Sequence, residues 1–172
     1  MDRERAKEPV ATTPGTMDSR LAGDSKGTAL FAWDGSLKFD RSAGTAVLVD
    51  GVSVTHKALA DGLVTQLRCA QLTAHLDSAA AGETQMMSGG LRSAEATGAV
   101  WLASRDSEMV AQWLSFDAVT RIVDAKGGAG VGDLVTVTGQ NGAAPLSAQE
   151  IIWNLGENTF RLIGAQPVTA PR

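Results

Sequence analysis

The sequence predicts an all-β fold in which repeated antiparallel strands form a bent sheet. The first observation behind this prediction is a phrase of apolar residues whose copies span 67–74, 109–116 and 146–153. In each copy a large apolar residue is followed, at fixed offsets, by Ala or Cys, by Leu or Ile, and by a last apolar residue. A partial copy at 37–40 repeats the ending found at 114–117.

The copies recur at a spacing that is typical of repeated supersecondary units. The intervals are 35, 42 and 37 residues, counted between Leu37, Leu72, Leu114 and Ile151. Units of this length bury an apolar face only by stacking on one another. We therefore expect a surface or a groove rather than a single catalytic pocket.

The second observation is that a glycine-led, valine-rich stretch alternates with each phrase. These stretches lie at 46–54, 97–102 and 132–137, and each has β-branched residues at period two beside a glycine. This pattern is typical of a strand entered from a turn or a bulge. Asn-Gly within 138–142 predicts a hairpin turn, and 78–90 is small and polar, as in a longer loop.

Helices are the alternative for two segments. Apolar residues in 59–80 also fit helical spacing, and 147–156 begins with a sequence that resembles a capping box. We favour strands because the three copies should share one conformation. The middle copy, with its aromatics, Ser115 and terminal Asp117, is a poor helix and a good strand.

The internal spacing of the phrase predicts a bend. Residues two apart share a face of a strand, but the Ala or Cys and the Leu or Ile of each copy are three apart. Either a bulge lies between them or both faces are apolar, and several bulges in register would fold the sheet into a trough or an open sandwich. In regular strands Trp101 and Trp113 would lie on the face opposite Leu102 and Leu114.

Composition excludes several functions. The 172 residues are 44% hydrophobic and 20% charged, as in a globular protein with a core, and the net charge of −4 argues against nucleic-acid binding. The sequence contains no run of about 18 apolar residues, so no membrane-spanning helix is expected. There is no spaced Cys/His set for zinc, since His56 and His75 are the only histidines. No nucleophile motif or phosphate loop is present either, so we expect no enzyme, no metal and no cofactor.

Smaller features have ordinary structural interpretations. Cys69 occupies a position where the other copies have Ala, which predicts a buried thiol. Asp40, Asp77, Asp117 and Asn154 close or follow the phrases and are expected to stabilise turns.

The expected organisation is a linker-like or disordered segment at 1–27, a β domain at 28–168 and a short tail at 169–172. The first segment is rich in charge, Thr, Pro, Ser and Gly, and no secretory signal is recognisable in it.

Three segments together resemble the OstA-like (LptA/LptC-type) domain of lipopolysaccharide transport. They are 94–100, 111–117, and 132–137 with the following 146–151, and the resemblance extends over roughly residues 30–165. It implies a sheet bent into a V-shaped β-jelly-roll that binds the acyl chains of a lipopolysaccharide or a similar glycolipid. It also implies a periplasmic or cell-envelope location and pairing of exposed edge strands with similar β modules or with itself.

The alternation of side chains names the residues that would line such a groove. They are Phe39, Val52, Val54, Leu72, Val100, Leu114, Phe116, Val135, Val137, Ile151 and Trp153. The alternative is a structural or interaction module of a larger cell-envelope protein, with a filled core and no ligand. The state of the interior, open or packed shut, distinguishes the two hypotheses.

Overall fold

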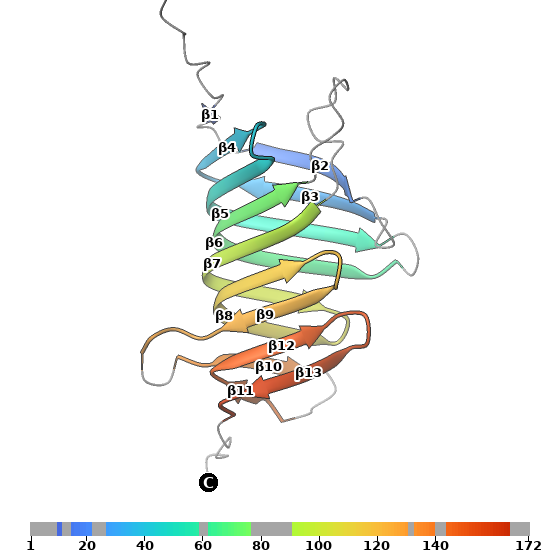
Figure 1. Ribbon diagram of the computed structural model, residues 1–172, viewed down its shortest axis with the longest axis vertical. Coiled ribbons are helices and arrows are strands. Elements are labelled where there is room, and N and C mark those ends of the chain that lie inside the picture. Colours follow the sequence, from blue (N-terminus) through green and yellow to red (C-terminus); the bar gives the residue numbers. More distant parts are fainter. Residues whose placement is uncertain are drawn as a thin grey trace, which may run out of the picture.

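The computed structural model describes residues 10–11, 15–21, 27–58, 62–76, 91–130, 133–139 and 144–165. Throughout these residues the regular secondary structure is β-strand, and the strand pairs are antiparallel within one 13-stranded sheet (Figure 1). The strands are β1 (Val10–Ala11), β2 (Gly15–Leu21), β3 (Gly27–Trp33), β4 (Ser36–Asp40), β5 (Thr45–Ala58), β6 (Val64–Leu76), β7 (Leu91–Ser104), β8 (Ser107–Asp117), β9 (Ile122–Lys126), β10 (Val135–Gly139), β11 (Leu146–Ala148), β12 (Glu150–Asn154) and β13 (Thr159–Ile163).

The all-β prediction is confirmed, and the recurring phrases are strands. They form β6, β8 and the pair β11 and β12, while the partial copy forms β4. The valine-rich stretches at 46–54 and 97–102 lie in β5 and β7, and residues 135–137 of the third lie in β10. In the two segments with helical spacing the regular structure that is described is β-strand, in β6, β11 and β12. The described ranges contain no helix of the length and hydropathy needed to cross a membrane.

The sheet folds over on itself because its long strands are bulged near their middles. The register of β5 on β6 shifts between Val49 and Val52, and that of β7 on β8 shifts between Thr97 and Val100. On β6 the register with β7 shifts between Arg68 and Gln71. A bulge bends a strand, so aligned bulges on neighbouring strands create one crease across the sheet.

The crease divides the sheet into two layers that share the long strands. The first layer consists of β4, residues 45–49 of β5, 71–76 of β6, 91–97 of β7 and 113–117 of β8, and then β9, β12 and β13. The second layer consists of β2, β3, residues 52–58 of β5, 64–68 of β6, 100–104 of β7 and 107–111 of β8, and then β10 and β11. Figure 1 shows the strands stacked along the long axis of the molecule, from β4 and β2 to β11 and β13.

Backbone in the left-handed region makes the crease possible in β5 and β7. Asp50 and Gly51 have φ of 64° and 55°, and Gly98 and Ala99 have φ of 77° and 47°. Such values are favourable for glycine and unusual for residues with a side chain. A Cβ atom on Gly98 would also lie 2.8 Å from that of Ala70, so the bulges of β6 and β7 pack closely against each other.

The phrase fits this geometry. In β6 both Cys69 and Leu72 are buried, and the two residues between them are exposed. In β8 Ala111 and Leu114 are buried in the same way. Of the alternatives that the spacing left open, the bulge is therefore the one that β6 adopts.

Three turns have the same construction. Asp40 Oδ1 accepts hydrogen bonds from the amides two and three residues on, at 2.8 and 3.1 Å. Asp117 Oδ1 does so at 2.9 and 2.8 Å, and Asn154 Oδ1 at 2.9 and 3.1 Å. The turn role expected for these residues is observed, while Asp77 lies outside the described residues. Hydrogen bonds lower the pKa of Asp40, chiefly that from the Ser42 hydroxyl, and that of Asp117, chiefly those from Thr120.

Three segments need comment against the sequence-based expectations. The segment 1–27, expected to be linker-like, contributes β1 and β2, which pair with β4 and β3. The expected loop at 78–90 and most of the expected turn at 138–142 lie outside the described residues, although β10 and β11 on either side of that turn do pair antiparallel.

Candidate functional site

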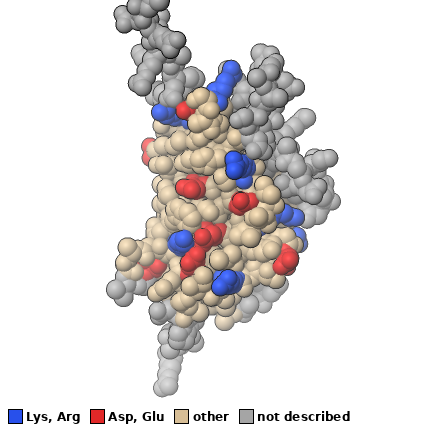
Figure 2. Space-filling model, in the orientation of Figure 1, with Lys and Arg blue, Asp and Glu red and all other residues tan. Residues whose placement is uncertain are grey.

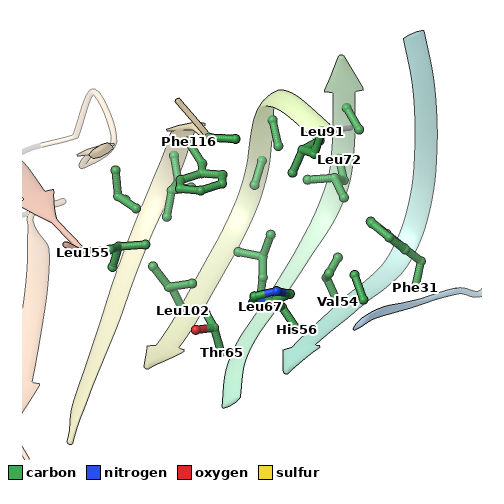
Figure 3. A pocket seen from close by; sticks show the side chains of 17 residues that line it. Phe31, Val54, His56, Thr65, Leu67, Leu72, Leu91, Leu102, Phe116 and Leu155 are labelled. Atoms are coloured by element: carbon green, nitrogen blue, oxygen red, sulfur yellow. The ribbon is translucent and has the colours of Figure 1, made fainter. Parts of the chain in front are cut away.

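A cavity of about 140 Å³ lies between the two layers (Figure 3). It is almost wholly apolar, and both layers contribute to its wall. Its lining residues are Ala29, Phe31, Val54, His56, Thr65, Leu67, Leu72, Ala74, Leu91, Ala94, Ala96, Leu102, Leu114, Phe116, Ala118, Val123 and Leu155.

Alternation explains which side chains reach the cavity. On each strand every second residue points inward, so Leu72 and Ala74 of β6 face it from the first layer and Leu67 of the same strand faces it from the second. Five of the lining residues are alanines, two of which, Ala94 and Ala96, are successive inward positions of β7. Their short side chains leave unfilled the space that larger residues occupy elsewhere in the core.

The two margins of the cavity differ in polarity. In the second layer the lining includes His56 and Thr65, which are direct cross-strand neighbours. In the first layer the margin is apolar and includes the half-buried residues Leu91, Phe116 and Leu155 (Figure 3). The site is thus an apolar cavity with polar side chains along one margin.

The residues named from sequence alternation fall into two groups. Val54, Leu72, Leu114 and Phe116 line the cavity. The other seven do not border it: six are buried elsewhere in the core and Phe39 packs against that core half-buried. These six are Val52, Val100, Val135, Val137, Ile151 and Trp153.

The C-terminal end of the body is packed more tightly than the middle. Ile151 and Trp153 are 0% and 1% exposed. The Trp153 ring stacks on that of Phe160, with 4.9 Å between the ring centroids, and its Nε1 donates a hydrogen bond of 3.3 Å to Asn158. The interior is therefore closed at this end and hollow near β6 and β7.

Sequence reasoning missed the polar margin and the alanines. His56 entered the sequence analysis only as one of two histidines without a zinc site, yet it lines the cavity. The signal was present, because His56 continues the inward series Val52 and Val54 at period two. The alanines carry no such signal, since a small residue is compatible with either face of a strand.

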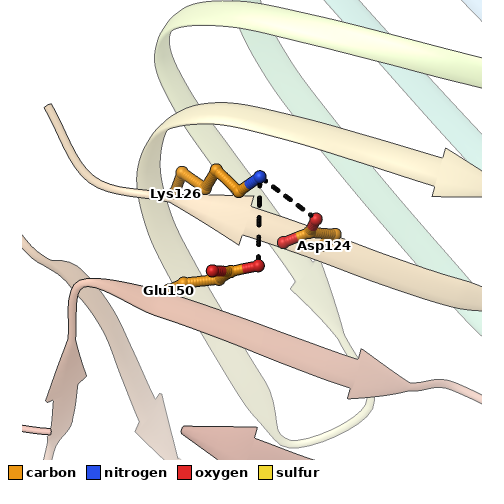
Figure 4. A network of polar contacts seen from close by, with 3 residues as sticks. All are labelled: Asp124, Lys126 and Glu150. Atoms are coloured by element: carbon orange, nitrogen blue, oxygen red, sulfur yellow. Dashed lines mark ion pairs between the residues drawn. The ribbon is translucent and has the colours of Figure 1, made fainter. Parts of the chain in front are cut away.

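The outer faces of the layers carry two of the tryptophans. Trp101 and Trp113 lie opposite the buried residues, as expected, and cations cover their rings: the Arg68 guanidinium carbon is 5.1 Å from the Trp101 centroid and Lys126 Nζ is 5.0 Å from that of Trp113. Lys126 Nζ also lies 3.6 Å from Asp124 and 3.9 Å from Glu150 (Figure 4).

The charges and reactive groups suggest no other site. On the face drawn in Figure 2, basic and acidic side chains are interspersed and neither sign forms a continuous patch. Within the described ranges no group of three or more His, Cys, Asp or Glu residues could hold a metal ion. Cys69 is 6% exposed, and burial raises the pKa of its thiol to about 11.

Two antiparallel layers that share creased strands around an apolar interior define the OstA-like, LptA-type β-jelly-roll, and this chain has that fold. Among solved structures it is similar to LptH, the LptA-homologous periplasmic component of the lipopolysaccharide transport device of Pseudomonas aeruginosa. The TM-score is 0.59 at 14% identity, and the match covers 84% of this chain and 89% of LptH. No family model and no curated protein sequence matches the chain.

Proposed function

We propose that this protein binds the acyl part of a lipopolysaccharide or a similar amphipathic glycolipid between its two layers. It would do so without catalysis, in the periplasm, as one component of a route between bacterial membranes. The observation that carries the proposal is the apolar cavity of about 140 Å³, in a fold that is shared with a lipopolysaccharide-transport component.

The energetics of the cavity support this proposal. Burial contributes about 0.8 kcal/mol for each methylene. A segment of about six carbons inside the cavity would gain about 5 kcal/mol before the cost of ordering the lipid. Binding of this kind needs no specific polar contact, so an apolar wall is sufficient for holding and releasing a lipid.

Photo-crosslinking from the cavity margin tests the proposal. A benzophenone amino acid replaces Phe116, which lines the cavity, in protein produced in the bacterial envelope. The matched control replaces Trp113, which lies on the outer face of the same strand. We expect lipopolysaccharide to crosslink to position 116 and not to position 113; equal labelling, or none at 116, would contradict the proposal.

Edge-strand pairing is a further part of the proposed role. Within the described residues β13 pairs only with β12 and β11 only with β10, so the C-terminal end of each layer presents an open edge in that part of the chain. Such edges can add a strand from another chain. We propose that similar β modules, or copies of this chain, pair there.

The second candidate function is a ligand-free structural module. The closed packing around Ile151 and Trp153 favours it, because an interior filled along its whole length would need no lipid. If native mass spectrometry of protein purified from the envelope detects no lipid and the crosslinker at Phe116 labels none, this second function is the better account.

A further inference from the structure

A row of polar side chains crosses the second layer at the margin of the cavity. His56 pairs with Thr65, Thr65 with Ser104, and Ser104 with Ser107 in the strand register. All four therefore occupy equivalent positions on β5, β6, β7 and β8.

The neighbouring row toward the crease is apolar. It consists of Val54, Leu67, Leu102 and Met109, which are likewise paired in register. Along each of these strands, the inward-facing side chain is therefore polar at one position and apolar at the next inward-facing position toward the crease. A ligand that enters from this margin meets polar groups first and a dry wall beyond them.

The hydroxyls of this row are arranged to donate a hydrogen bond. Thr65 Oγ1 and Ser104 Oγ are 3.0 Å apart, and Ser104 is only 3% exposed. Each hydroxyl carries one hydrogen, and one hydrogen is used in the bond between them. When Ser104 Oγ is the donor of that bond, the remaining hydrogen is on Thr65 and can be donated to an acceptor in the cavity, which Thr65 lines directly.

Among the described residues, those at the opposite margin include no comparable group. The residues that border the cavity there, Leu91, Phe116 and Leu155, are apolar. An amphipathic ligand would therefore be held in one orientation, with its head against Thr65 and its chain against the first layer.

The volume limits the number of chains. An apolar cavity of about 150 Å³ holds a ligand of the size of benzene, and this cavity measures about 140 Å³. It can enclose roughly six carbons of one chain, but not the several chains of a lipid A side by side.

From these observations we infer that the cavity takes a single acyl chain whose head group accepts a hydrogen bond from the Thr65–Ser104 pair. The inference rests on the proposed binding of acyl chains between the layers, and it replaces lipopolysaccharide, as the ligand, with a lipid of one chain. A carboxylate or a phosphate head fits equally, so a fatty acid and a lysophospholipid are the sources to be compared.

Displacement of the fluorescent probe N-phenyl-1-naphthylamine from the full chain tests the inference. The competitors are dodecanoate, lauroyl lysophosphatidylcholine and dodecyltrimethylammonium, and the last has a twelve-carbon chain without an acceptor head. Hexa-acylated lipid A is the fourth competitor. Native mass spectrometry counts the bound chains.

The variant is Thr65→Val, which keeps the shape and removes the hydroxyl. Its matched control is Thr136→Val, because Thr136 Oγ1 makes the same kind of contact, 3.2 Å to Ser147 Oγ, on the outer face of β10. Circular dichroism confirms that both variants fold.

We expect one chain per protein and at least one acceptor-headed competitor that binds about tenfold more weakly to Thr65→Val, the loss of one hydrogen bond to a charged group. Dodecyltrimethylammonium should be unaffected by this variant, and Thr136→Val should bind as wild type. Which of the two acceptor heads responds identifies the source. Affinity independent of the head group, or two chains bound together, would overturn the inference. Displacement by lipid A alone would overturn it and leave the proposed function standing, whereas displacement by none of the lipids would overturn both.

Discussion

Replacing Ala94 by leucine tests the space between the layers directly. Ala94 is 9% exposed and lines the cavity of about 140 Å³. Leucine adds three carbons, which take up roughly 90 Å³ at about 30 Å³ for each water-sized group. They therefore fit, and their burial should raise the free energy of unfolding by up to about 2 kcal/mol.

The matched control is the same change at Ala125. This residue is 0% exposed, does not border the cavity, and is paired with Leu114 and Ile151 on either side. Leucine has no room there, and overpacking a filled core typically costs about 1–3 kcal/mol. The two substitutions are chemically identical, so the sign of the effect depends only on the local packing.

Urea denaturation measures the free energy of unfolding of both variants. Binding of N-phenyl-1-naphthylamine reports whether the cavity is still open. We expect Ala94→Leu to be more stable than wild type and to lose the probe. If Ala94→Leu is destabilised as strongly as Ala125→Leu and still binds the probe, the reasoning from cavity to ligand is wrong.

Three other predictions concern the core, a turn and the thiol. Ile151→Ala should lower the free energy of unfolding by about 2–5 kcal/mol in urea, because the side chain is fully buried at the closed end. Asp117→Asn should fold normally, since Asn154 serves the equivalent turn. The lowered pKa of Asp117 gives the wild-type protein a stability that is lost as the pH falls through that pKa. Urea titrations at pH 7 and pH 2.5 should show this loss in wild type and not in Asp117→Asn. Burial raises the pKa of Cys69 from 9.0 to about 11, so its contribution to stability is full below about pH 9 and declines toward about pH 11. Cys69→Ala, which places at this position the residue found at Ala111, should not show this decline.

Much of the fold could be predicted from the sequence, because the spacing of apolar residues in its repeats indicates where the strands lie and where they bend. The three-residue spacing between Cys69 and Leu72 left a bulge or two apolar faces as the alternatives, and a bulge is what β6 adopts. The turn residues were also predictable, since the Asp40 and Asp117 carboxylates accept hydrogen bonds from nearby backbone amides. Strands without a recurring phrase, such as β9 and β13, gave no comparable signal.

The site was less predictable, for a physical reason. Alternation predicts that Val52 and Leu72 both point inward. It does not predict that Leu72 borders the cavity while Val52 is packed in the core, because that depends on contacts with the opposite layer that are distant in sequence. Space arises where small residues from several strands coincide, as Ala74 and Ala94 do in register. No single stretch of sequence records that coincidence.

The sharing of long strands between the layers has a mechanical consequence. Because β5, β6, β7 and β8 each run from one layer into the other, these four strands join the layers through the backbone itself. One layer cannot slide along the other without bending these strands at the crease. Spreading the layers at one of the four strands therefore also strains the strands beside it.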